Sequence, residues 1–208
     1  MSAENHKLFI LRQGDKFEPL NLVLGKNYRE EITFLVLPGV TADIDLNAEL
    51  SGAGAEVKIR GLYLCGSDEI VSIRTNIRHS VPSTSSSQLI CGIAGGQSRA
   101  SFTGRIVVVQ DAQKTEAFQT NRNILLSDSA RIETHPELEI YADDVQCSHG
   151  ATIGRLSEEE QFYMRSRGIP EGEAKILQMI SFLAPVLEGL EDKEALMQQI
   201  EKSLRQMV

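Results

Sequence analysis

The chain has 208 residues, of which 41% are hydrophobic, and a formal net charge of −8 at pH 7. This length and apolar content suffice for one domain with a substantial core, and they exclude broad disorder. The acidic balance, with no basic block to offset it, argues against a general binder of nucleic acid or of anionic membranes.

The N-terminus predicts no targeting segment. Residues 1–5 lack the basic and apolar regions of a signal peptide, and the longest apolar run, residues 34–37, is far too short to cross a bilayer. The sequence therefore predicts a cytoplasmic protein. Its cysteines, Cys65, Cys91 and Cys147, are odd in number and widely spaced. That pattern excludes a disulfide framework and a C-x-x-C metal pair, and it favours reduced thiols.

From about residue 31 to residue 153 the hydrophobic pattern repeats every two residues. Residues 42–50 alternate apolar and polar side chains, and residues 71–77 do the same, as expected for strands with one buried face. Further strands are predicted at residues 57–64, 101–109, 117–126, 130–134 and 138–141. Clusters of glycine, serine and aspartate separate them, and no helical period intervenes. The pattern predicts an all-β region of many short strands.

Two architectures fit this pattern, a β-sandwich and a β-solenoid. Sandwich hairpins usually carry Asn-Gly or Asp-Gly turns, and the chain contains neither. Small and polar residues recur at the bends, which suits coils that stack on one another. No exact repeat is visible, so the residues favour the solenoid without excluding the sandwich.

At Leu156 the pattern changes to helices. Ser157 followed by Glu160 reads as a capping box, and Gly168 is placed to end this first helix. Pro170 suits the start of a second helix, which Pro185 should kink or end. The second helix carries an apolar face of Ile176, Leu177, Ile180, Leu183 and Leu187. A third helix from residue 191 carries Leu196, Ile200 and Leu204.

These elements predict two parts, a β-body over residues 1–155 and a helical subdomain over residues 156–208. The simplest expectation for the helices is that they pack on the last coil and cap its open edge.

Several longer strings resemble one protein family. They are LEIYADDVQCSHGATIG at 138–154, FYMRSRGI at 162–169, DAQKTEAFQTNRNILLS at 111–127, GAE with GLY between 54 and 63, and H-x-x-P at 79–82. Together they resemble the SufB/SufD family, the scaffolds of the Suf iron–sulfur cluster assembly machinery. The string Cys147-Ser148-His149-Gly150 resembles the SufD-like branch. The resemblance implies an all-β core with an α-helical tail, in which a flattened right-handed parallel β-helix precedes a small helical subdomain.

The resemblance also implies a scaffold rather than an enzyme. His149 is the residue implicated, by analogy, in forming or holding the nascent cluster at the interface with a SufB-like protein, and Cys147 shares its strand face by parity. A histidine on an apolar strand face is more often structural, but an imidazole is able to ligate iron. Four ligands are not present, so a transient cluster would be shared with a partner and none held by this chain alone.

The implied partners are a SufB-like protein or a second copy of the chain, and a SufC-type ATPase. The resemblance places the ATPase on the helical tail, with Phe162, Tyr163, Arg165 and Arg167 as the candidate contacts. No phosphate-binding G-x-x-x-x-G-K-[ST] spacing occurs, so the chain itself binds no nucleotide in that mode.

Two departures leave an alternative open. Family members commonly have a lysine where Cys91 stands, and full-length members begin with a helical domain and further coils. A shortened paralogue that keeps the interaction surfaces without a cluster role is therefore the alternative. A β-helix carbohydrate enzyme is remote, because aromatic residues are 5%, Trp is absent and acids do not cluster. Asp143 and Asp144 are adjacent, so they are expected in a turn rather than as a pair.

Overall fold

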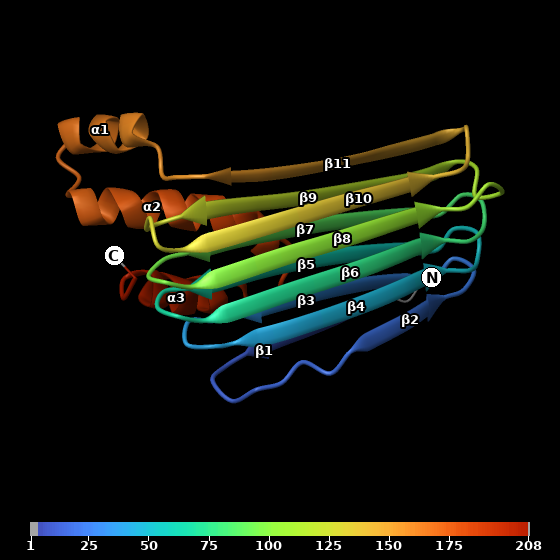
Figure 1. The fold of residues 1–208 in the computed structure, drawn as a ribbon, viewed down its shortest axis with the longest axis horizontal. Coiled ribbons are helices and arrows are strands. Elements are labelled where there is room, and N and C mark those ends of the chain that lie inside the picture. Colours follow the sequence, from blue (N-terminus) through green and yellow to red (C-terminus); the bar gives the residue numbers. More distant parts are fainter. Residues whose placement is uncertain (1–3, 208) are drawn as a thin grey trace.

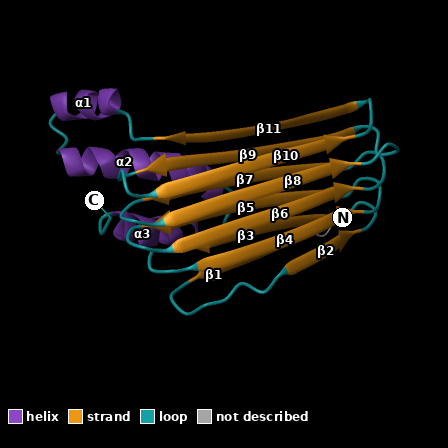
Figure 2. Cartoon of the chain, in the orientation of Figure 1, coloured by secondary structure: helices purple, strands orange, loops and turns teal. Residues whose placement is uncertain are grey.

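The structure, a computed structural model, describes residues 4–207. In this range the chain alternates between two sheets whose neighbouring strands are all parallel. It forms a parallel β-solenoid of about five turns followed by three helices (Figures 1 and 2), which confirms the predicted fold class. Sheet A contains β1 (Glu4–Leu11), β3 (Arg29–Val36), β5 (Glu56–Cys65), β7 (Ser85–Ala94), β9 (Thr115–Leu125) and β11 (Val145–Gly154). Sheet B contains β2 (Leu20–Leu24), β4 (Ala42–Leu50), β6 (Ile70–His79), β8 (Arg99–Val108) and β10 (Arg131–Ile140).

Along one edge of the solenoid, successive turns each contain one residue with a left-handed backbone conformation. Asn27, Gly54, Ser83 and Lys114 have φ between 56° and 77°. Each donates its backbone N–H to a carbonyl in the turn of the next coil, at N···O distances of 2.5 to 3.0 Å. Because the strands are parallel, the turns connect stacked coils rather than hairpins, which explains why hairpin dipeptides are absent.

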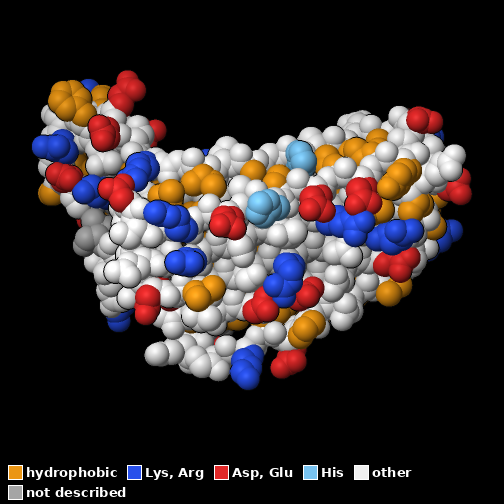
Figure 3. Space-filling view, viewed as in Figure 1, with side chains coloured by type: hydrophobic (Ala, Val, Ile, Leu, Met, Phe, Trp, Pro, Cys, Tyr) orange, Lys and Arg blue, Asp and Glu red, His pale blue; other side chains and the backbone are white. Residues whose placement is uncertain are grey.

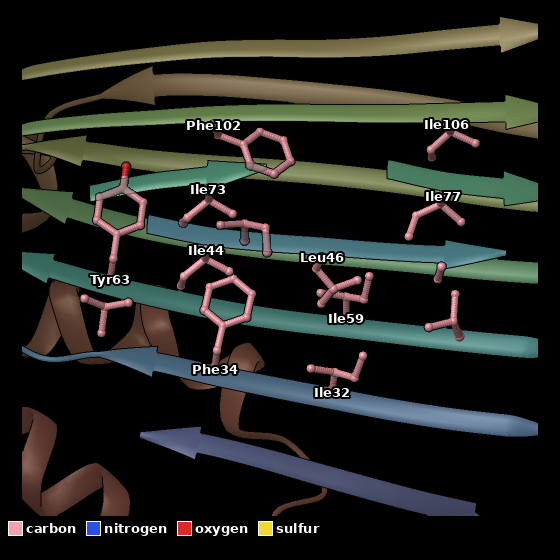
Figure 4. Close-up of a cluster of buried hydrophobic side chains, with 14 of the residues drawn as sticks. Ile32, Phe34, Ile44, Leu46, Ile59, Tyr63, Ile73, Ile77, Phe102 and Ile106 are labelled. Carbon is pink, nitrogen blue, oxygen red and sulfur yellow. The ribbon is translucent and has the colours of Figure 1, made fainter. Parts of the chain in front are cut away.

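The interior is a continuous apolar core between the two sheets (Figure 4). Large rings fit because the next coil carries glycine at the paired position. Phe34 pairs with Gly61 and Tyr63 with Gly92, and a Cβ on either glycine would lie about 2 Å from the ring below it. These glycines are therefore required by close approach of side chains, and they fix the order of large and small residues along the stack.

The helical tail follows its sequence signals closely. It comprises α1 (Glu158–Ser166), α2 (Glu171–Leu183), the 3₁₀ helix η1 (Ala184–Leu187) and α3 (Lys193–Leu204). The Ser157 hydroxyl accepts the Glu160 N–H at 3.2 Å, so the predicted N-cap is confirmed. Gly168 follows the helix with φ +87°, and α2 ends two residues before Pro185.

The helices do not cap the last coil, so that expectation was wrong. α2, η1 and α3 pack on the outer face of sheet A and share a second core with it. Sheet A supplies Leu35, Leu62, Leu64, Cys91, Ile93 and Ile124 to this core. The outward residues near the ends of these strands are apolar, and burying them decides where the helices lie. Leu177 is 40% exposed, so its predicted place on the buried face was also wrong.

The strand predictions missed some elements. Residues 130–134 and 138–141 belong to one strand, β10, which runs through Pro136. Strands β1, β2, β3 and β7 were not predicted, and β7 was missed because its first half is Ser-Ser-Ser-Gln. Between residues 4 and 207 no helix is both long and apolar enough to span a membrane.

Candidate functional site

The last coil leaves one end of the solenoid open. β10 and β11 each pair with a strand on one side only. The inward residues of β9 are at most 2% exposed, but the residues stacked on them in β11 are half-buried or exposed. The open row of β11 consists of Val145, Cys147, His149, Ala151 and Ile153. Figure 3 shows the surface hollowed along this margin, between the projecting helix α1 and the turns at the other end.

His149 and Cys147 both lie in this open row. Strand pairing places Cys147 directly above Ala117 and His149 above Gln119. His149 is exposed and Cys147 is half-buried. Burial raises the pKa of the Cys147 thiol, although the backbone N–H of Ala117 lowers it. At neutral pH the side chain is therefore a thiol, and binding a metal requires it to lose its proton.

The open row alone does not make a metal centre. Among residues 4–207 no three His, Cys, Asp or Glu side chains converge to hold a metal ion. His149 and Cys147 are an imidazole and a thiol, donor types that iron–sulfur clusters accept, but two donors do not complete a cluster site. Asp143 and Asp144 lie in the exposed turn between β10 and β11, as expected, and not in this row.

Beneath the open row runs a buried polar network that the sequence reasoning missed. Gln88 Nε2 donates to Gln119 Oε1 at 3.2 Å, and Gln119 Nε2 donates to the Gly104 carbonyl of sheet B at 3.1 Å. Asn123 Nδ2 donates to the Thr152 carbonyl of β11 at 3.1 Å. The signal was present as the alternation Gln119, Asn121, Asn123, three amides on one face of a strand. Such a buried row needs hydrogen-bond partners in neighbouring coils.

The same network reaches two coils back through Tyr63. Because Gly92 has no side chain, the Tyr63 hydroxyl passes over it and donates to Asn123 Oδ1 at 2.7 Å. Burial raises the pKa of Tyr63 well above its ordinary value, so the hydroxyl remains a donor. The position of β11 is thus connected to the middle of the solenoid by directional bonds.

His79, part of the H-x-x-P string, is fully buried and lies away from the open row. Its Nδ1 is 2.8 Å from Thr84 Oγ1, and its Nε2 is 2.8 Å from Ser86 Oγ. Burial lowers its pKa to about 4, so the ring is neutral at physiological pH. The ring links β6 of sheet B to β7 of sheet A across the intervening turn.

The other two cysteines are separate from the open row. Cys91 points to the outer face of sheet A, beneath the helices, and burial raises its pKa to about 11, although Arg122 lowers it. Cys65 is inside the core, where burial raises its pKa to about 12. Both are protonated and inaccessible, so they fit small buried residues.

The helical tail presents a second surface. No residue of α1 is buried, and Phe162 and Tyr163 are 72% and 60% exposed. The Arg167 guanidinium lies 5.3 Å from the centre of the Tyr163 ring, and Arg165 lies 4.0 Å from Glu171.

A cleft lies on each side of α1. One of about 590 Å³ is lined by Phe162 and Arg165 together with Leu125, Leu126 and Lys175. The other, of about 480 Å³, includes Tyr163, Met164 and Leu177 between α1 and α2. Of the four residues singled out in the sequence, Phe162, Tyr163 and Arg165 thus lie on one exposed helix, and Arg167 is its C-cap residue.

Comparison with known proteins gives a consistent result. The family described as "SUF system FeS cluster assembly, SufBD core domain" matches residues 16–182. The chain is 39% identical over 165 residues to the iron–sulfur cluster assembly protein SufD of Escherichia coli, covering 79% of this chain and 39% of that protein. It is 36% identical over 157 residues to a SufBD family protein of Synechocystis, covering 71% and 35%. It is 32% identical over 151 residues to the chloroplastic protein ABCI7 of Arabidopsis thaliana, covering 72% and 32%. The chain therefore spans less than half the length of these relatives.

Proposed function

The chain belongs to the SufBD family of the Suf iron–sulfur cluster assembly system, and on this premise we propose that it is a SufD-like scaffold. It pairs through the open end of its solenoid with a SufB-like protein or a second copy of itself. It contributes His149, with Cys147 beside it, to a transient cluster shared across that seam. It performs no catalytic turnover, and it docks a SufC-type ATPase through α1.

The open last coil is the observation that carries this proposal. A solenoid buries each inward row under the next coil, and here the final row, with an imidazole and a thiol in it, has no cover. A cluster usually needs four protein ligands, and thiolate and imidazole are both suitable. A partner seated on the open end would bury the apolar residues of the row and supply the missing donors.

The ATPase surface is supported by α1. A helix with no buried residue and two exposed aromatic rings next to arginines has the composition of an interface hot spot. The division into a solenoid over residues 1–155 and a helical subdomain over 156–208 stays a prediction. The cytoplasm remains the expected compartment.

The cluster role is tested by anaerobic iron–sulfur reconstitution of the chain together with a SufB-like protein and a SufC-type ATPase. His149→Ala should abolish or strongly reduce the cluster absorbance, and Cys147→Ser should have a smaller effect. His135→Ala is the matched control, because His135 is an exposed histidine on the opposite, outer face of the last coil. Cluster formation unchanged by His149→Ala would show that the site is wrongly assigned.

The ATPase contact is tested by co-purification. Phe162→Ala with Tyr163→Ala should lose the ATPase while leaving the solenoid pairing intact. Phe118→Ala, which removes an exposed ring from the outer face of sheet A, should retain it. A complex that holds both partners but never carries a cluster would favour the alternative, an interaction protein without a cluster role.

A further inference from the structure

The two clefts beside α1 differ in charge. The cleft of about 590 Å³, called the basic cleft from here on, is lined by three cations and two carboxylates: Arg155, Arg165, Lys175, Glu158 and Glu171. The cleft of about 480 Å³ has two carboxylates in its lining, Glu159 and Glu160, and no Lys or Arg. The basic cleft therefore carries a net positive charge, in a chain whose net charge is −8. Of the two clefts, it is the one suited to an anion.

The basic cleft exists because α1 stands away from the solenoid. The helix begins directly after β11 at the N-cap Ser157, and Gly168, with φ +87°, turns the chain back into α2. Figure 1 shows α1 beyond the ends of β9 and β11. No residue of α1 is buried, so the helix leaves the space between itself and the solenoid unfilled.

The rest of the lining is largely apolar. Half-buried side chains from β9, from the segments that follow β9 and β11, and from the end of the tail line the cleft: Leu125, Leu126, Leu156 and Met207. All but Leu125 pack against the second core, under the helices. A concave site of roughly 300 to 1,000 Å³ at the junction of two parts of a chain, with apolar walls and a few charged groups, is typical of small-molecule binding.

Glu171 shows that this cleft can hold a carboxylate. Its Oε1 lies 2.7 Å from Lys175 Nζ, and its Oε2 lies 4.0 Å from Arg165 Nη1. The hydrogen bond from Lys175 lowers the pKa of Glu171, so the carboxylate is ionised at neutral pH. The third cation, Arg155, pairs with Asp128, which does not line the cleft. A carboxylate that enters the cleft would compete with Glu171 for the same two cations.

We propose that the basic cleft binds a small amphipathic carboxylate, whose apolar body lies on the leucines and whose carboxylate meets Lys175 and Arg165. The cations give the ligand its charge preference, and the half-buried leucines give it an apolar surface to cover. The inference goes beyond the proposed function, because it requires neither a cluster nor a partner. Phe162 and Arg165 also belong to the proposed ATPase surface, so the chain alone is the form to measure.

The test titrates the full chain with decanoate by isothermal titration calorimetry. Saturable one-to-one binding is expected, with a dissociation constant of about 0.03 to 1 mM. Each methylene added between hexanoate and decanoate should tighten binding about 2- to 4-fold. Acetate, which has the charge alone, and decanol, which has the apolar body alone, should bind far more weakly. Decanol that binds as tightly as decanoate, or decanoate that does not saturate, would overturn the proposal.

Variants with opposite expected signs place the ligand and separate binding from misfolding. Lys175→Met keeps the aliphatic stem and should weaken decanoate binding about 2- to 5-fold. Glu171→Gln removes the competing carboxylate and should tighten binding by a similar factor, which a misfolded chain would not do. Lys202→Met, at an exposed lysine of α3 outside the cleft, is the matched control and should bind like the wild type.

A bulky substitution and amide chemical shifts test the location directly. Gln161→Trp should fill the cleft from α1 and abolish binding, while circular dichroism and the melting temperature stay those of the wild type. In the wild type, decanoate should shift the amide resonances of Leu126, Leu156 and Gln161. Decanoate affinity unchanged in both Lys175→Met and Glu171→Gln, or amide shifts confined to another surface, would show that the basic cleft is not the site.

Discussion

The two sheets enclose the same interior but line it with different chemistry. On sheet B the inward residues of β4, β6 and β8 are apolar or glycine, apart from Thr75 and His79. On sheet A the inward residues of β7 and β9 include Ser86, Gln88, Gln119, Asn121 and Asn123, all of them buried. Sheet A therefore becomes polar towards the open end, and sheet B does not.

This difference shows how the site is held in place. Burial of apolar surface is strong but non-directional, so sheet B supplies cohesion without specifying a position for each side chain. Buried amides have to meet defined partners, so sheet A specifies which residue of one coil lies on which residue of the next. His149 and Cys147 belong to the sheet with the directional interior.

The largest expected loss of stability comes from sheet B, whose inner face is mostly apolar. Phe102→Ala removes a side chain of β8 that is 2% exposed, and it should lower the free energy of unfolding by about 3 to 5 kcal/mol. Urea unfolding followed by circular dichroism measures the change. Phe118→Ala, an exposed ring on the outer face, should change stability by about 0.5 kcal/mol or less. Equal losses in the two variants would mean that sheet B does not supply the cohesion.

The second effect depends on pH and concerns His79, a polar exception on sheet B. Its pKa is lowered from 6.5 to about 4 by burial, so between these values the unfolded chain binds a proton that the folded chain does not. Stability from this group is complete above pH 6.5 and falls as the pH falls towards 4, by roughly 3 kcal/mol. Unfolding curves measured from pH 7 to pH 4 should show this slope in the wild type and a smaller one in His79→Gln. Identical slopes would contradict the assignment.

The third effect tests the directional side. Tyr63→Phe leaves Asn123 Oδ1 without the hydroxyl that donates to it at 2.7 Å, and it should cost about 1 to 3 kcal/mol of unfolding free energy. In a double-mutant cycle with Asn123→Leu, part of this loss should be absent once both partners are removed. Tyr141→Phe, on an exposed ring, provides the control. If the losses from the two substitutions simply add, Tyr63 and Asn123 do not stabilise each other.

The smallest effect should have the opposite sign. Thr75 is the other polar residue among the inward residues of β4, β6 and β8, and its buried hydroxyl has no hydrogen-bond partner among the described residues. Thr75→Val should therefore raise the unfolding free energy by up to about 1 kcal/mol, because an unsatisfied polar group is removed. The same denaturation assay measures it, with Ser86→Ala on sheet A as the destabilising counterpart. Destabilisation by Thr75→Val would contradict the view that the inner face of sheet B is stabilised by apolar burial alone.

The sequence predicted the local structure well where one rule dominated. Alternation identified β4 and β6, and capping residues such as Ser157 and Gly168 placed α1. The sequence-based prediction failed where contacts between distant parts of the chain determine the structure. Residues around Pro136 were split into two strands because proline usually interrupts a ladder, whereas an edge strand tolerates it on its free side. The helices were predicted on the wrong surface because an apolar helix face does not specify which surface of the solenoid it packs against.

The candidate site was only partly predictable. The alternation of side chains along a strand predicted that Cys147 and His149 share one face. The resemblance to a family predicted that this face has a role in holding a cluster. The sequence contained no sign that this row lacks a covering coil, because the same alternation describes a buried row and an open one. The sequence shows the amide residues Gln119, Asn121 and Asn123, but it does not show their hydrogen-bond partners. Those partners include Gln88 and Thr152, which lie in other coils about 30 residues away.

The uncovered last coil also has a statistical consequence. A solenoid behaves approximately as a one-dimensional lattice, in which each coil is stabilised by its own contacts and by one coupling term to each neighbour. An interior coil has two such terms, and the coil of β10 and β11 has one at this end. It should open more often than the middle of the solenoid, which amide exchange would detect as faster exchange in β11 than in β7. Any chain that bound to β11 would act as the missing neighbour, and its association would then be coupled to the local order of the His149 strand in a single equilibrium.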